Sequence, residues 1–104
     1  TSVEDRQTGI PQEYTLEQNY PNPFNPSTTI RYGLQARSTV RLEVYSILGQ
    51  KIDELVTANL EPGFYNVTWN ASVPSGTYFY KLEAVTLDKS VKSFRQVRKM
   101  TLMK

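Results

Sequence analysis

The sequence contains no cysteine and no histidine. Without cysteine, the chain can build neither a disulfide framework nor a thiolate metal site. Without histidine, it lacks the usual general base near neutral pH and the commonest metal ligand. No serine or threonine therefore has a histidine to activate it as a nucleophile. We expect no catalytic residue, no metal site and no cofactor, and the chain is not predicted to be an enzyme.

The sequence also lacks a large excess of charge of either sign and has no long apolar run. The chain has 12 basic and 10 acidic residues, a net charge of +2. Half of the basic residues lie between Lys81 and Lys99, but the excess is too small for a nucleic-acid footprint. No apolar run approaches the roughly 20 residues that span a bilayer, and the first residues lack the pattern of a signal peptide. We expect no nucleic-acid partner and no transmembrane segment, and Thr1 indicates a piece of a longer protein.

The pattern of the sequence changes near Tyr14. Residues 1–13 are polar and aperiodic and contain Gly9 and Pro11, which is typical of the end of a linker. From Tyr14 onward, short alternating runs are separated by turn residues about every 8 to 12 residues, as in sandwiches and barrels. We predict a linker end over 1–13 and one β domain over 14–104.

The alternation predicts individual strands and their faces. The inward-facing set should include Ile30, Val44, Trp69 and Leu102, whereas Glu43 should face outward. About seven strands in some 90 residues indicate an all-β, immunoglobulin-like antiparallel β-sandwich. The predicted runs are 14–18, 28–34, 39–47, 51–56, 65–69, 78–84 and 90–103.

Turn residues separate these runs. Leu48-Gly49-Gln50 and Pro74-Ser75-Gly76 predict turns, and in Pro62-Gly63 the glycine should accept a positive φ. After Val44 the alternation slips at Tyr45-Ser46-Ile47, which indicates a bulge or the end of the strand. The prolines between Asn19 and Pro26 cannot donate to a ladder, so this stretch should be a rigid extended loop or edge segment.

Five motifs resemble one known family. QNYPNPFNPSTTIRY (18–32), VYSILGQKI (44–52), GFYNVTWN (63–70), SGTYFYKL (75–82) and RKMTLMK (98–104) are similar to signatures of the type A C-terminal sorting domains of type IX secretion. These domains in turn resemble the immunoglobulin-like domain of the flagellar hook-capping protein. The resemblance covers about 14–104. One departure is the longer segment 85–93, which should lengthen the last hairpin around Asp88-Lys89 and leaves the register of the last strand open.

The resemblance implies a function in protein export. Family members sit at the C-terminus of secreted enzymes, adhesins and other cargo in Bacteroidetes-type bacteria. It implies a fused N-terminal cargo domain that passes through the periplasm, is recognised through the sorting domain and crosses the outer-membrane type IX translocon. A sortase-like peptidase is then expected to cut within 1–13, which leaves the cargo at the cell surface or in the extracellular space. We expect the domain to be a monomer.

The resemblance also suggests sorting-signal residues. Candidates are Gly76 and Tyr78 in the fourth motif and Lys99, Leu102 and Lys104 in the last. A terminal strand can be captured by a partner through strand addition. Alternatively, these residues are structural: Leu102 belongs to the core and the two lysines protect an edge against aggregation. In that case Gly76 ends a turn and Tyr78 begins a core strand. Residues expected to have a structural role in the motifs are Asn19, Pro21, Asn22, Pro23, Phe24, Asn25, Pro26, Gly49, Gly63 and Trp69.

Other functions are weaker alternatives. The Asn-Pro-rich loop is either a docking surface, since fixed prolines cost little entropy to bind, or a structural element in which Asn side chains satisfy backbone groups. Asn22, Asn25 and Asn70 lack the close carboxylates that calcium prefers. The sequons at 66–68 and 70–72 are chance matches. A carbohydrate-binding accessory domain would need exposed rings, whereas the pattern places most rings inside; a passive immunoglobulin-like spacer is the remaining alternative.

Overall fold

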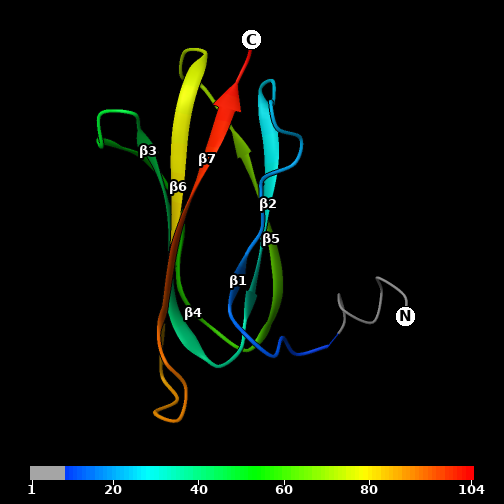
Figure 1. The fold of residues 1–104 in the computed structure, drawn as a ribbon, viewed down its shortest axis with the longest axis vertical. Coiled ribbons are helices and arrows are strands. Elements are labelled where there is room, and N and C mark those ends of the chain that lie inside the picture. Colours follow the sequence, from blue (N-terminus) through cyan, green and yellow to red (C-terminus); the bar gives the residue numbers. More distant parts are fainter. Residues whose placement is uncertain (1–8) are drawn as a thin grey trace.

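A computed structural model describes residues 9–104, which form seven strands and no helix (Figure 1). In this part of the chain, then, there is no helix of the length and apolar character that a bilayer crossing requires. The strands are β1 (Thr15–Leu16), β2 (Ser27–Leu34), β3 (Ser38–Ser46), β4 (Lys51–Leu60), β5 (Gly63–Asn70), β6 (Gly76–Thr86) and β7 (Phe94–Leu102).

The strands form two facing sheets. One has the order β1-β2-β5 and the other β4-β3-β6-β7, and every pair of neighbours is antiparallel. In Figure 1 the two layers face each other along the long axis, and the β6–β7 hairpin loop extends beyond one end of the body. The predicted antiparallel β-sandwich is confirmed.

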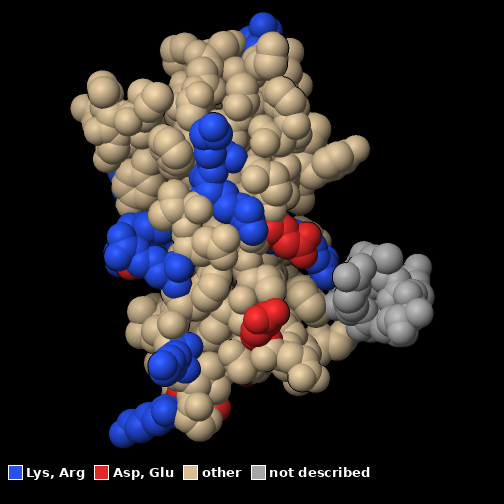
Figure 2. Space-filling model, viewed as in Figure 1, with Lys and Arg blue, Asp and Glu red and all other residues tan. Residues whose placement is uncertain are grey.

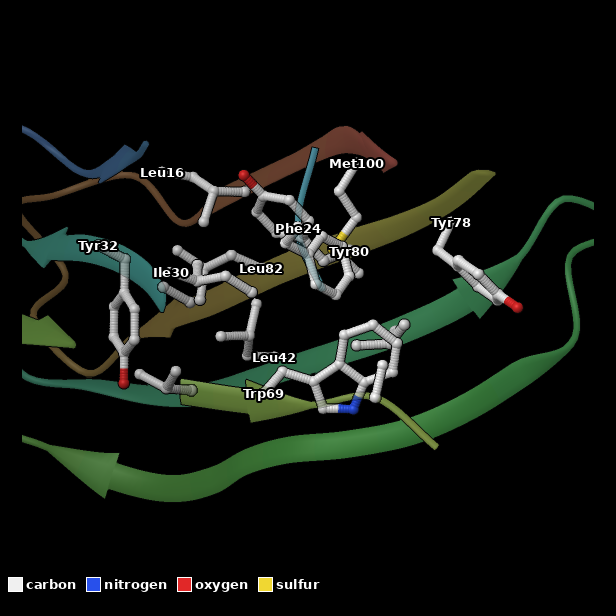
Figure 3. Packing of buried hydrophobic residues seen from close by; sticks show 14 of the residues in the cluster. Leu16, Phe24, Ile30, Tyr32, Leu42, Trp69, Tyr78, Tyr80, Leu82 and Met100 are labelled. Carbon is white, nitrogen blue, oxygen red and sulfur yellow. The ribbon is translucent and has the colours of Figure 1, made fainter. Parts of the chain in front are cut away.

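Alternation along each strand sends every second side chain into a common interior. In β6, Tyr78, Tyr80, Leu82 and Ala84 are buried, and the residues between them are partly exposed. Burial of this apolar surface is the main stabilising contribution to such a fold. Figure 3 shows residues from both sheets meeting in this interior. Its members are Tyr14, Leu16, Phe24, Ile30, Tyr32, Leu34, Val40, Leu42, Val44, Trp69, Ala71, Tyr78, Tyr80, Leu82, Ala84, Met100 and Leu102.

The irregularity predicted after Val44 lies in the partner strand. β3 pairs with β6 without interruption and ends at Ser46, but its ladder with β4 shifts twice, between Leu42 and Glu43 and between Val44 and Tyr45. The register leaves Leu55 and Ile52 of β4 as the extra residues. Each bulge turns its extra residue toward the core. Ile52 and Leu55 therefore both pack against the interior, although they are three positions apart in the sequence.

The first and last strands are shorter than the sequence predicts, whereas β4 and β5 extend beyond the predicted runs 51–56 and 65–69. β1 has two residues instead of five, because Gln18 leaves the strand and its Nε2 donates to the carbonyl of Lys99. β7 begins at Phe94 instead of Ser90. Before it, the loop closes on itself through a hydrogen bond from the Ser90 amide to Asp88 Oδ1 (2.9 Å). The longer hairpin therefore leaves the register intact, with Gly76 opposite Leu102 and Ala84 opposite Phe94.

The three predicted turns all place a glycine at positive φ, and Gly49 and Gly63 illustrate why. Gly49 has φ 86° in the β3–β4 turn, which is closed by hydrogen bonds between Ser46 and both Gly49 and Gln50. Gly63 has φ 154° at the start of β5. L-residues rarely adopt such backbone angles, so both turns depend on the missing Cβ.

Candidate functional site

The Asn-Pro-rich segment and the end of β7 lie side by side. We call residues 18–26 the clasp. The amide of Phe24 donates to the carbonyl of Thr101 (3.0 Å), and the amide of Met103 donates to the carbonyl of Phe24 (2.9 Å). The Thr101 amide donates to Asn22 Oδ1 (3.0 Å), and Gln18 Nε2 donates to the Lys99 carbonyl (2.8 Å). The clasp thus completes the outer edge of β7 along its C-terminal half.

A buried asparagine fixes the clasp to both sheets. Asn19 is 2% exposed, and its Nδ2 donates to Thr28 Oγ1 (3.0 Å) and to the Pro21 carbonyl. Its backbone amide donates to the hydroxyl of Tyr80 (2.8 Å), which in turn donates to the carbonyl of Glu17. Burial raises the pKa of Tyr80 to about 12. The hydroxyl therefore stays protonated at neutral pH and can make both bonds.

Aromatic rings anchor the clasp in the core. The Phe24 ring is buried with its centroid 5.8 Å from that of Trp69, and Trp69 meets the edge of Tyr78 at 6.1 Å. Trp69 Nε1 donates to Asp53 Oδ2 (3.0 Å). Figure 3 shows Phe24, Trp69 and Tyr78 in the same half of the interior. The predicted core positions of Trp69 and Tyr78 are confirmed, whereas the Asp53 partner was not visible in the sequence.

The structure brings four of the five candidate sorting residues to the β6–β7 ladder, and Lys104 lies just beyond its end. Gly76 is the register partner of Leu102, Tyr78 pairs with Met100, and Phe79 pairs with Lys99. The amide of Lys104 donates to Ser75 Oγ (2.9 Å), which holds the tail against the turn before β6. The two motifs therefore form the paired ends of β6 and β7, near the C-terminus in Figure 1.

The five candidates differ in accessibility. Leu102 is 1% exposed and Tyr78 is 8% exposed, and the Tyr78 hydroxyl donates to the Pro74 carbonyl. Gly76, Lys99 and Lys104 are exposed. In the folded domain, only these exposed residues can contact a partner directly, and the buried ones hold the ladder that presents them.

Two of the three asparagine side chains that could supply oxygens to a calcium ion already accept hydrogen bonds within the protein. Asn22 Oδ1 accepts from the Thr101 amide, and Asn70 Oδ1 accepts from the Ser27 hydroxyl. Over residues 9–104 there is no cluster of three acidic side chains suited to a metal ion. The side-chain oxygens of Asn22 and Asn70 are thus accounted for by hydrogen bonds within the fold.

The aromatic side chains form pairs within the fold. Within residues 9–104, Tyr20 is the one exposed ring (80%). Tyr32 stacks on Tyr65 with 5.5 Å between ring centroids, and the Arg31 guanidinium lies 4.6 Å from the centre of the Phe64 ring. The described residues therefore offer no row of exposed rings on which a sugar could stack.

Glu43 was predicted to face solvent, and this is wrong in part. Its side chain lies on the outer face of the four-stranded sheet, but the residue is 4% exposed. The Tyr45 hydroxyl donates to its Oε1 (2.6 Å), Lys51 Nζ lies 3.2 Å from Oε2, and Lys81 Nζ lies 3.8 Å from Oε1. The Tyr45 hydrogen bond, followed by Lys51 and Lys81, lowers the pKa of Glu43 although burial opposes the shift. Tyr45 lies two positions along the same strand, but Lys51 and Lys81 reach Glu43 only through the register of β3, β4 and β6, which the linear sequence does not show.

Comparisons with known proteins agree with this geometry. The sequence profile described as "Secretion system C-terminal sorting domain" matches residues 18–95. Among solved structures, the crystal structure of CopC from Methylosinus trichosporium OB3b is similar, with a TM-score of 0.57 and 12% identity over 86% of this chain and 93% of that chain. At that identity the likeness extends to the fold alone. The comparison with curated proteins gave no match.

Proposed function

Because this chain belongs to the secretion system C-terminal sorting domains, we propose that it directs a cargo protein, fused on its N-terminal side, through the outer-membrane type IX translocon. Such a domain is a sorting signal for type IX secretion and not a catalytic unit. A type IX sorting tail implies export to the cell surface or the extracellular space. Transit through the periplasm, with removal by a sortase-like peptidase, completes the proposed route.

The family match over residues 18–95 is the observation that carries this proposal. The geometry supports it in one respect, because the opening motif, as the clasp, and the closing motif, as the end of β7, are hydrogen-bonded to each other. Residues 14–104 are proposed to act as one unit, with residues 1–13 as the linker end that the peptidase cuts. Of that linker, residues 1–8 lie outside the described part of the chain.

Recognition is proposed to use the exposed residues at the end of the β6–β7 ladder. Lys99 and Lys104 present two cations there, next to the exposed turn that leads into Gly76. Tyr78 and Leu102 act indirectly, because their side chains are buried. Substitution of either one would disturb the fold together with any signal.

The proposal is tested by secretion of a reporter. A periplasm-targeted reporter is fused to residues 1–104 and expressed in a bacterium with a type IX system, next to the same reporter without the domain. We expect only the fusion in the medium or on the cell surface. If both reporters stay in the periplasm, the chain is not a sufficient sorting signal.

Two lysine variants test the proposed contact. Lys99→Ala with Lys104→Ala should reduce secretion of the fusion, because both cations are exposed and can be removed without loss of core packing. The matched control is Lys89→Ala with Lys92→Ala, which removes two exposed cations from the β6–β7 loop. Equal secretion by both pairs would mean that the terminal lysines do not carry the signal.

A further inference from the structure

The outer edge of β7 is covered only in part. The clasp satisfies the outward backbone groups of Thr101 and the carbonyl of Lys99. In an antiparallel strand, the backbone groups of alternate residues point to the same side. The amides and carbonyls of Arg95 and Val97 therefore also point away from β6, and within residues 9–104 they have no hydrogen-bond partner.

This uncovered part of the edge is accessible. Arg95 and Lys99 are exposed, and Val97 is 51% exposed. β7 is the last strand of its sheet, so no strand pairs with this edge, although Arg98 Nε donates to the carbonyl of Leu16 in β1, which lies on the same side of β7 (Figure 1). An accessible row of unpaired amides and carbonyls is a template for one more strand.

The last strand and its flanking segments carry charge of one sign, although β6 places Glu83 opposite Arg95. Residues 89–104 contain six basic residues and no acidic residue; three of the six, Arg95, Arg98 and Lys99, lie in β7. Figure 2 shows several Lys and Arg side chains on the face that carries β7, with the larger acidic patches to the right of them and small acidic patches elsewhere on this face. Like charges oppose pairing of this edge with a second copy of the same edge, and they favour a partner of opposite sign.

We propose that the edge of β7 at Arg95–Lys99 binds an extended acidic segment of the type IX export machinery by strand addition. This inference rests on the proposed function and names the partner chemistry at the same domain. Main-chain hydrogen bonds to Val97 supply affinity, and the flanking cations select an acidic segment. The clasp leaves this part of the edge open and closes the part beyond it, so it sets where the added strand ends.

The outer edge of β5, one of the other long edge strands, provides a matched control. Thr28 and Ile30 pair with Trp69 and Val67, and the Ala71 amide donates to the Pro26 carbonyl. The same alternation then directs the backbone groups of Thr68 away from β2. Thr68 is exposed, so proline can remove one outward donor from the β5 edge as it does at Val97 on the β7 edge.

The experiment compares secretion of the reporter fused to residues 1–104 in four forms: unchanged, Val97→Pro, Val97→Ala and Thr68→Pro. Loss of one main-chain hydrogen bond should lower secretion of Val97→Pro about fivefold. Val97→Ala and Thr68→Pro should remain near the unchanged fusion. Wild-type secretion by Val97→Pro, or an equal loss in Thr68→Pro, overturns the inference. Failure of the unchanged fusion to be secreted would instead refute the proposed function.

A charge variant decides the result if Val97→Pro lowers the melting temperature. Arg95→Glu reverses one exposed charge beside the edge, whereas Lys92→Glu reverses one exposed charge before β7 begins. Secretion should fall severalfold for Arg95→Glu and stay unchanged for Lys92→Glu. An equal response of the two variants would show that the charge beside the edge does not select the partner.

Discussion

At the residue scale, single polar contacts fix the aromatic core and the outer face of the sheet. Trp69 and Tyr80 each bury a ring and use their polar atom for a hydrogen bond, to Asp53 and to Glu17 respectively. Glu43 shows the same principle on the outer face, where a nearly buried carboxylate is compensated by a hydroxyl and nearby cations. Buried polar groups are tolerated only with such partners.

Truncation of Trp69 tests the packing at this scale. Trp69→Ala should lower the free energy of unfolding by about 3–5 kcal/mol, because it removes a buried ring that contacts Phe24 and Tyr78. Urea denaturation followed by far-UV circular dichroism measures the change. Trp69→Phe keeps a ring but loses the bond to Asp53 and should cost less. A loss below about 1 kcal/mol in Trp69→Ala would contradict the burial of this side chain.

The acid dependence of stability tests the Glu43 cluster. The pKa of Glu43 is lowered from 4.5 in the folded protein, so its contribution to stability is present above 4.5 and is lost as the pH falls through the folded pKa. Glu43→Gln should therefore lose less stability than the wild type when the pH is lowered from 5 to about 2.5. Urea midpoints across this range measure the difference.

Tyr45→Phe is the control for that cluster. It keeps the carboxylate but removes the hydrogen bond that contributes most to the lowered pKa. Its acid dependence should lie between those of the wild type and Glu43→Gln. Identical acid dependence in all three proteins would show that Glu43 makes no linked contribution.

At the element scale, alternation was sufficient to predict most strands. β2, β3, β5 and β6 each have one buried face and one more exposed face, so their sequences alternate. The predicted inward residues Ile30, Val44 and Trp69 are buried as expected. The bulges of β4 could not be predicted, because they depend on pairing with β3. The clasp on β7 was also not predicted, since Phe24 meets Leu102 only after the two sheets have packed.

Removal of the end of β7 tests the claim that this element is structural. A chain of residues 1–97 loses Met100 and Leu102 from the core, the partners of Gly76 and Tyr78, and the anchors of the clasp. We expect it to show no cooperative thermal transition. A chain of residues 1–103, which lacks only the exposed Lys104, should melt cooperatively. A cooperative transition in the shorter chain would contradict the claim.

At the scale of the whole molecule, the clasp near the N-terminal side and the last strand, β7, are hydrogen-bonded to each other. The clasp near the N-terminal side covers one half of the last strand, and the other half remains open beside a row of cations. The candidate site could be predicted in part, because the resemblance identified the terminal motifs. Which of their residues are accessible depends on the register of β6 and β7 and on the clasp, and only the fold could show this.

The most direct test of the central claim compares two hosts. The reporter fused to residues 1–104 is expressed in a bacterium with a type IX translocon and in the same strain lacking it, and the reporter outside the periplasm is quantified. The account predicts external reporter only when the translocon is present. External reporter at equal levels in both strains would contradict the assignment of this domain to type IX secretion.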